Sequence, residues 1–117
     1  MSAGDLRGHL RKLDALLRLI KYPRDVDYSS LSTGDPSAFL PILSYTLTSF
    51  CPRLTAQLLQ AGLELTGKTD LRFIDTVYKV LRDVFQYHPV LSKQQFLQSG
   101  FSQRKIGVTC DVINLVL

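Results

Sequence analysis

The stretch DLRFIDTVYKVLRDVFQYHP, residues 70–89, carries apolar side chains over about half of a helix surface. Charged side chains occupy most of the remaining surface. An apolar face this broad needs neighbours on several sides, because water would otherwise surround its apolar groups. The stretch therefore predicts a helix around which several other segments of the chain pack.

Two stronger helix patterns precede that stretch. Apolar residues recur every three or four positions over residues 5–21, and Pro23 disfavours helical geometry at the residue before it. Asp35 followed by Pro36 is a typical helix start, with the aspartate as N-cap and the proline in the first turn. The apolar spacing predicts that this helix continues to about Phe50.

The remaining helices have weaker patterns. Residues 53–64 have helical spacing, and Ser92 with Gln95 forms the capping-box pattern of a short helix. Ser102 is predicted to cap a last helix, where β-branched residues lower helical propensity and leave a strand as the alternative. The polar residues 28–33 are predicted to form a turn-rich connection.

The length of 117 residues suits one domain with one core, so residues 1–117 are expected to form a single domain. The formal net charge is +4, which favours acidic partners without choosing among nucleic acid, anionic lipid and acidic protein surfaces. The chain ends on NLVL without a polar tail. We interpret this ending as a sign that the chain is the N-terminal module of a longer protein.

The N-terminal segment and the cysteines predict the cellular compartment. Charged residues interrupt the first helix pattern, so the chain lacks the apolar core of a signal peptide. No run approaches the roughly twenty apolar residues that span a bilayer. Cys51 and Cys110 lie far apart and have neither metal-ligand nor disulfide-rich spacing. We therefore expect two unbridged, reduced thiols in a soluble intracellular protein, with no membrane partner.

Motifs for catalysis or cofactor binding are missing from the sequence. His9 and His88 lie in different segments without other ligand types at metal-binding spacing. The glycines do not form a phosphate-binding loop or a dinucleotide fingerprint, and no serine lies in a nucleophile elbow. We expect no enzyme activity, no metal and no cofactor.

The first predicted helix has a basic face. Arg7, Arg11 and Arg18 cluster within about 40° on a helical wheel, opposite the leucines of the same helix. Asp14 lies close enough in sequence to offset part of their charge. Two interpretations stay open from the residues alone. The face is either an ordinary solvated surface or a docking surface for an acidic polymer.

Other basic residues could widen that surface if the fold brings them together. The complete set of candidate binding residues is Arg7, Arg11, Arg18, Lys21, Lys79, Arg82, Arg104 and Lys105. The aromatic residues follow the apolar patterns and do not interleave with these charges. Single-stranded nucleic acid requires exposed stacking platforms, so no nucleic-acid partner is expected.

Three segments carry a resemblance to a known family: GDPSAFLPILSYTLTSF, DLRFIDTVYKVLRDVFQYHPVLSKQQFLQSGF and KIGVTCDVINLVL. Together with the opening GDLRGHLRKLDALLRLIKYPRDVD, they closely resemble the N-terminal domain of the centrosomal protein of 44 kDa family. This domain is similar to calponin-homology domains. The resemblance covers essentially the whole chain and preserves the order of the segments.

The resemblance implies an all-α, calponin-homology-like helical bundle around a buried central helix, which would be residues 70–86. It also implies a centriolar protein that binds microtubules and supports centriole-to-centrosome conversion. Its expected location is the centriole and centrosome, within the cytoskeleton of the cytoplasm. The expected partners are tubulin and other centriolar proteins. The alternatives are a centriolar scaffold domain that binds another protein and, with less support from a single domain, an actin-binding module.

Overall fold

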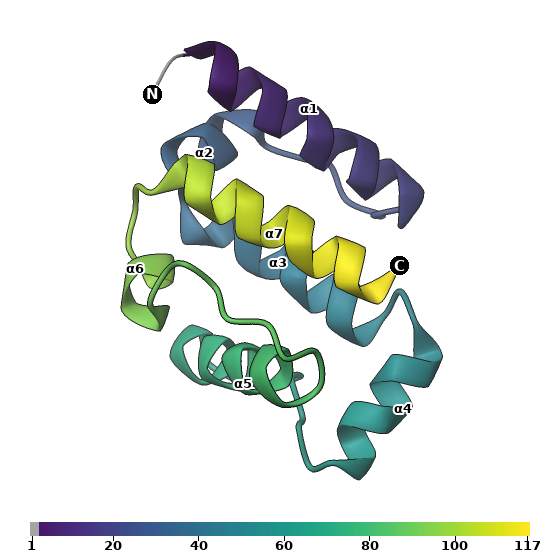
Figure 1. Ribbon diagram of the computed structural model, residues 1–117. Helices are drawn as coiled ribbons and strands as arrows, with labels where there is room; N and C mark the ends of the chain where they lie inside the picture. The colour runs from purple at the N-terminus through teal and green to yellow at the C-terminus, as the bar shows by residue number, and fades with distance from the viewer. Residues whose placement is uncertain (1–2) are drawn as a thin grey trace.

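The computed structural model describes residues 3–117, with side chains from Leu6 onward. Within this range all regular structure is helical, and no strand occurs (Figure 1). The helices are α1 (Ala3–Leu19), α2 (Tyr28–Thr33), α3 (Pro36–Thr48), α4 (Pro52–Gln60), α5 (Asp70–Asp83), α6 (Lys93–Leu97) and α7 (Ser102–Val116). The all-α prediction is confirmed, and the strand alternative for the end of the chain is wrong.

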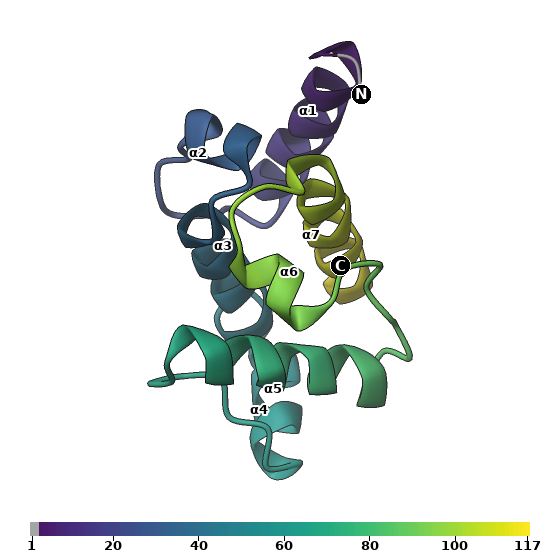
Figure 2. The same ribbon diagram turned by 90° about the vertical axis from the view of Figure 1, so that its left-hand side faces the viewer.

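The helix at the centre of the fold is α7. Helices α1, α2 and α3 all pack against it, as the two perpendicular views show (Figures 1 and 2). Its buried side chains lie on more than one face and include Ile106, Val108 and Ile113. The prediction that residues 70–86 form the central helix is therefore wrong.

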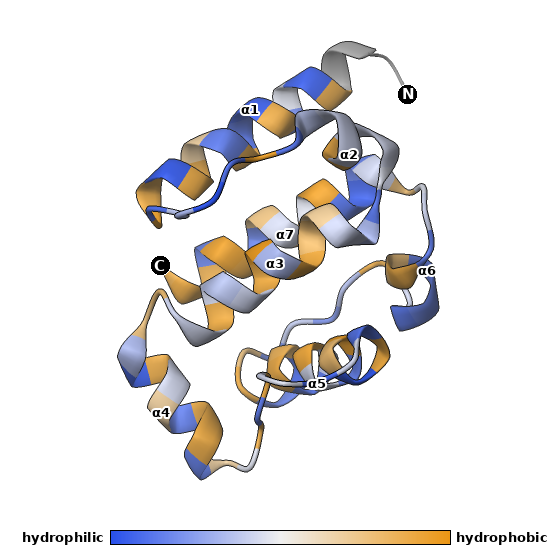
Figure 3. Cartoon of the chain, turned by 180° about the vertical axis from the view of Figure 1, so that it is seen from behind, coloured by the Kyte–Doolittle hydropathy of each residue, from blue (hydrophilic) through white to orange (hydrophobic). Residues whose placement is uncertain are grey.

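Helix α5 lies at the edge of the fold and buries one face. Phe73, Val77 and Leu81 belong to that face, whereas Leu71 on the same helix is 65% exposed. The helix contacts α6, and its charged side faces solvent. Figure 3 shows the same separation in α1, where hydrophilic and hydrophobic residues alternate along the helix. Helix α5 can lie at the edge of the fold because Leu71, part of its broad apolar face, stays exposed to solvent.

The polar segment that the sequence analysis predicted as a turn forms the short helix α2. Asp27 caps its start, since the carboxylate accepts bonds from the backbone N–H and the hydroxyl of Ser30, at 3.1 and 2.9 Å. Leu31 is fully buried, and Gly34 ends the helix in the left-handed conformation. Serine-rich sequence has low helical propensity, so the caps and the buried leucine together stabilise this helix.

Local capping signals predicted the starts of α3 and α6 correctly. Asp35 caps α3, with its carboxylate 2.9 Å from a backbone N–H two residues on. Ser92 and Gln95 form the predicted reciprocal capping box of α6. Helix α7 differs, because Ser102 is its first residue and Phe101 is the N-cap, in the left-handed conformation with a φ of 54°.

The two cysteines are both free, as predicted. Cys110 is buried on α7, and Cys51 is half-buried at the start of α4. Burial raises the pKa of the Cys110 thiol to about 11. This thiol is therefore protonated and weakly nucleophilic at neutral pH.

Replacing Leu81 by alanine tests the packing of α5. Leu81 is 1% exposed, so the substitution should lower the free energy of unfolding by roughly 2–5 kcal/mol. Leu71→Ala on the exposed side of the same helix is the matched control and should change it by less than about 0.5 kcal/mol. Urea denaturation measures both. Equal effects of the two substitutions would contradict this orientation of α5.

Candidate protein-binding surface

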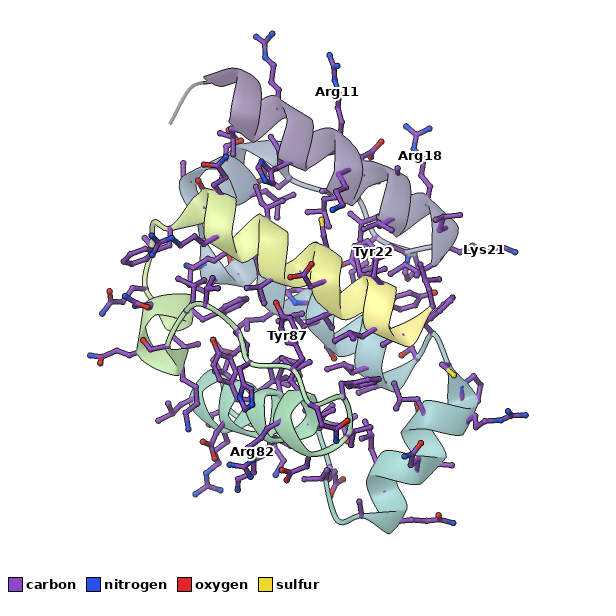
Figure 4. The ribbon with its side chains drawn as sticks, viewed as in Figure 1. Arg11, Arg18, Lys21, Tyr22, Arg82 and Tyr87 are labelled. Atoms are coloured by element: carbon purple, nitrogen blue, oxygen red, sulfur yellow. The ribbon has the colours of Figure 1, made fainter. Side chains whose placement is uncertain are left out.

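Helix α1 separates an apolar face from a basic one. Leu13 and Leu17 are buried against the rest of the fold, whereas Arg7, Arg11 and Arg18 are exposed. In Figure 4 Arg11 and Arg18 point away from the body of the molecule. Because their positions differ by multiples of about one helical turn, the three side chains share one side of the helix. The predicted clustering of these arginines is confirmed.

We call Arg7, Arg11, Arg18 and Lys21 the α1 basic face. Lys21 lies just beyond the end of α1, where its backbone has a φ of 55°. Its exposed side chain extends beyond the end of the helix (Figure 4). The face therefore continues past the last turn of α1.

The charge of the α1 basic face is compensated at one end. The Arg18 guanidinium lies 3.1 Å from the Asp14 carboxylate, as the sequence spacing predicted. Asp14 also accepts a hydrogen bond from the Tyr28 hydroxyl, which raises the pKa of Tyr28. Among the side chains that the structure describes, no carboxylate forms an ion pair with Arg7 or Arg11. Among the described side chains of α1, the arginines without an ion pair thus lie in the N-terminal half of the helix.

The basic residues of α5 lie at the opposite end of the molecule from α1 (Figures 2 and 4). Lys79 is 3.8 Å from Asp75, and Arg82 is 2.7 Å from Asp83. The bond to Arg82 lowers the pKa of Asp83, so this carboxylate stays ionised at neutral pH. The structure therefore does not join Lys79 and Arg82 to the α1 basic face, and it offsets their charge locally.

Asp75 of α5 has a second ion-pair partner, Lys93 of α6. Its ammonium lies 2.6 Å from Asp75 and lowers the pKa of that carboxyl group. Asp75 consequently faces two lysines, one from α5 and one from α6. Exposed pairs of this kind contribute little to stability, but they reduce the field that an acidic partner would meet.

Arg104 and Lys105 are neighbours in sequence with different surroundings. Arg104 is exposed at the start of α7, where it lines a hollow of about 270 Å³ together with His9 of α1. Lys105 is fully buried. The prediction that Lys105 contributes to a basic surface is therefore wrong, whereas Arg104 lies beside the first turns of α1.

The Lys105 ammonium joins two corners of the fold. It donates hydrogen bonds to the backbone carbonyl of Gly34, at 2.6 Å, and to that of Gln98. It also lies 5.7 Å from the centre of the Phe96 ring. Burial lowers the pKa of Lys105, and the nearby Asp35 carboxylate opposes this shift. A buried ammonium is tolerated here because carbonyl oxygens replace part of its hydration.

Replacing Lys105 by methionine tests this structural role. Methionine keeps an unbranched side chain but leaves the buried carbonyl of Gly34 and the partly buried carbonyl of Gln98 without this donor, so the free energy of unfolding should fall by about 1–3 kcal/mol. Arg104→Met is the matched control, and its exposed position predicts a change below about 0.5 kcal/mol. Thermal unfolding followed by calorimetry compares the two. A stabilised Lys105→Met protein would show that these hydrogen bonds do not hold the two corners together.

Sequence reasoning missed Lys12, an exposed residue on the flank of α1. Lys12 lies about 100° around the helix from Arg11, outside the narrow sector that defined the predicted cluster. Its charge acts on the Cys110 thiol of α7 and opposes the effect of burial on the pKa of that thiol. Lys12 thus extends positive charge toward α7, and a wider sector on the helical wheel would have included it.

One known protein family matches almost the whole length of the chain. The family described as "Centrosomal spindle body, CEP44" matches residues 5–117. The chain belongs to the CEP44 family. This membership confirms the predicted resemblance to the centrosomal protein of 44 kDa family and supports a centrosomal or centriolar role.

Relatives of the CEP44 family align with all 117 residues of the chain. Proteins named "Centrosomal protein of 44 kDa" are 57% identical in Xenopus tropicalis, 51% in Rattus norvegicus and 50% in Homo sapiens. The chain spans 30% of the length of each of these relatives. Their names support a location at the centrosome and centriole in the cytoplasm. Within the described residues, no helix is long and apolar enough to cross a membrane.

Proposed function

We propose that this CEP44-family chain is a microtubule-binding module of a centriolar protein that supports centriole-to-centrosome conversion. In this proposal the α1 basic face docks onto the acidic surface of tubulin. The observation that supports it most is the exposure of Arg7 and Arg11 without ion pairs among the described side chains. Together with Arg18 they follow one side of a helix over about 16 Å.

Electrostatics favours α1 over α5 as the docking side. Exposed basic residues increase the rate of encounter with an acidic surface and set the orientation of docking. Lys79 and Arg82 of α5 already face Asp75 and Asp83, so their net field is weaker. The two helices lie at opposite ends of the molecule, and one filament surface can contact only one of them.

The same proposal includes three further statements. Residues 1–117 act as one calponin-homology-like module, and this module needs no cofactor and catalyses no reaction. Its other partners are centriolar proteins. Family membership supports a centrosomal setting for this module and its partners, because the matched relatives are named as centrosomal proteins.

Co-sedimentation with microtubules over a salt series tests the proposed function. The wild-type chain should pellet with microtubules at low salt and lose affinity as salt rises, because exposed charges are screened beyond about 8 Å at physiological ionic strength. Actin filaments are the matched acidic polymer and should bind less protein at every salt concentration. No pelleting with microtubules at the lowest salt would contradict the proposal. Equal pelleting with actin would show a non-specific attraction between charges.

A further inference from the structure

We propose that an open hollow beside α3 binds an extended acidic peptide segment of a protein partner. The hollow has a volume of about 630 Å³ and lies between three parts of the chain. These parts are the connection after α1, the exposed side of α3, and the connection from α4 into α5. In Figure 3, α3 runs between the other two parts. No function described above uses this hollow.

Aromatic and proline side chains give the hollow a firm apolar wall. The Tyr22 and Tyr45 rings meet edge to face, with their centres 5.5 Å apart. The Tyr45 hydroxyl donates a hydrogen bond to the backbone carbonyl of Ile20, at 2.7 Å, which fixes this pair to the end of α1. The apolar lining also includes Pro41 and Phe73. A preformed wall of this kind binds an apolar side chain with little loss of conformational entropy.

The backbone of α3 has a carbonyl without its usual intrahelical donor beside the hollow. Pro41 lies inside the helix and has no N–H group, so the carbonyl of Ser37 lacks its usual donor four residues on. Ser37 and Pro41 both line the hollow. A peptide that lies along α3 can donate a main-chain N–H to such a carbonyl.

Charge at the rim selects an acidic occupant. Arg24 and Lys68 line the hollow from two different connections, and Asp70 is the only carboxylate in the lining. No ion pair involves Arg24 or Lys68 among the side chains that the structure describes. The exposed Lys21 adjoins Tyr22 and adds to the positive field. Acidic side chains on either side of one apolar anchor therefore complement both the rim and the wall.

The openness of the hollow favours a peptide over a compact ligand. An enclosed pocket buries most of a small molecule, whereas this hollow is open to solvent and would leave much of a small ligand exposed. Its tyrosine rings pack against each other edge to face, so they do not present free parallel platforms for stacked bases. A peptide segment matches these features better than a nucleic acid does.

The hollow and the α1 basic face differ in position and in chemistry. Tyr22 points toward the body of the molecule, whereas Arg11 points away from it (Figure 4). The hollow combines an apolar wall with a backbone acceptor, and the α1 basic face presents exposed charge alone. Peptide binding at the hollow can therefore be tested independently of microtubule binding.

Fluorescence anisotropy with the labelled peptide Glu-Glu-Phe-Glu-Glu measures the proposed binding. The peptide should bind saturably to the wild-type chain with a Kd below about 1 mM, and a version with lysine in place of glutamate should not. The variant Arg24→Glu/Lys68→Glu should lower the affinity at least about tenfold. Pro41→Ala, which restores the missing N–H, should also weaken binding.

The variant Arg7→Glu/Arg11→Glu is the matched control, because it makes the same change in total charge on α1. It should alter peptide affinity less than about threefold at physiological salt. Circular dichroism melts establish that each variant folds. Absence of saturable binding would overturn the proposal, and so would equal losses in the two double variants. Tighter binding of an oligonucleotide of the same charge would overturn the assignment to a peptide.

Discussion

Replacing Gly34 by alanine should lower the free energy of unfolding by about 3–5 kcal/mol, a large part of the stability of a small domain. Gly34 ends α2 with a φ of +76°, in the left-handed region that glycine adopts most easily. A Cβ at this position would lie 2.1 Å from the carbonyl oxygen of Gly100. The contact atom belongs to the backbone, so no side-chain rotation can relieve the overlap.

The neighbouring contacts explain why the backbone cannot easily move away. The N–H of Gly100 donates to the carbonyl of Thr33 at 3.0 Å, which holds the two corners against each other. Lys105 donates to Gly34 and Gln98 from the same junction. A shift at Gly34 would therefore break hydrogen bonds that involve buried groups.

Gly62→Ala is the matched control for this prediction. Gly62 has a φ of +75°, almost the same as that of Gly34, but no atom lies within 4 Å of the position of its Cβ. Alanine at this position should cost only the left-handed strain, about 1–2 kcal/mol. Urea denaturation of both variants separates strain from overlap. Equal losses of stability would show that the α2–α3 and α6–α7 corners are not in close contact.

Local signals predicted the parts of the fold that depend on a few neighbouring residues. Asp35 with Pro36 and Ser92 with Gln95 marked helix starts that the structure has. Each signal works within about one turn, because a side-chain oxygen satisfies a backbone N–H of the same segment. Such chemistry can be read from the sequence without knowledge of the rest of the fold.

Tertiary contacts decided what the sequence analysis missed. Helix α2 has polar residues of low propensity, and the burial of Leu31 between distant segments contributes to its stability. Helix α7 has β-branched residues and a glycine, yet it occupies the centre of the fold. The apolar face of residues 70–86 was broad, but its pattern could not show that Leu71 stays exposed.

Among the candidate binding residues, the sequence likewise predicted the local arrangement but not the contacts between distant segments. The common side of Arg7, Arg11 and Arg18 follows from helix geometry alone, so it was predictable. Lys105 was assigned wrongly because its partners include the carbonyl of Gly34, 71 residues away in sequence. The separation of Lys79 and Arg82 from α1 also depends on the packing of the helices and leaves no local signal.

Reversing two charges on α1 should have the largest effect on function. The variant Arg7→Glu/Arg11→Glu replaces the two arginines of the α1 basic face that lack ion pairs among the described side chains, and would place like charges against an acidic filament. These positions test the surface better than Arg18 does, because Arg18→Glu would also break the ion pair with Asp14. Both side chains are exposed, so the fold should lose less than about 0.5 kcal/mol per substitution.

Microtubule co-sedimentation of two charge-reversed proteins tests the proposed function most directly. Lys79→Glu/Arg82→Glu on α5 is the matched variant, since it changes the total charge equally at the opposite end of the molecule. With both variants folded, the α1 reversal should weaken binding by at least about tenfold and the α5 reversal by less than about threefold. If the α1 variant pellets with microtubules as well as the wild-type chain does, the α1 basic face is not the microtubule contact.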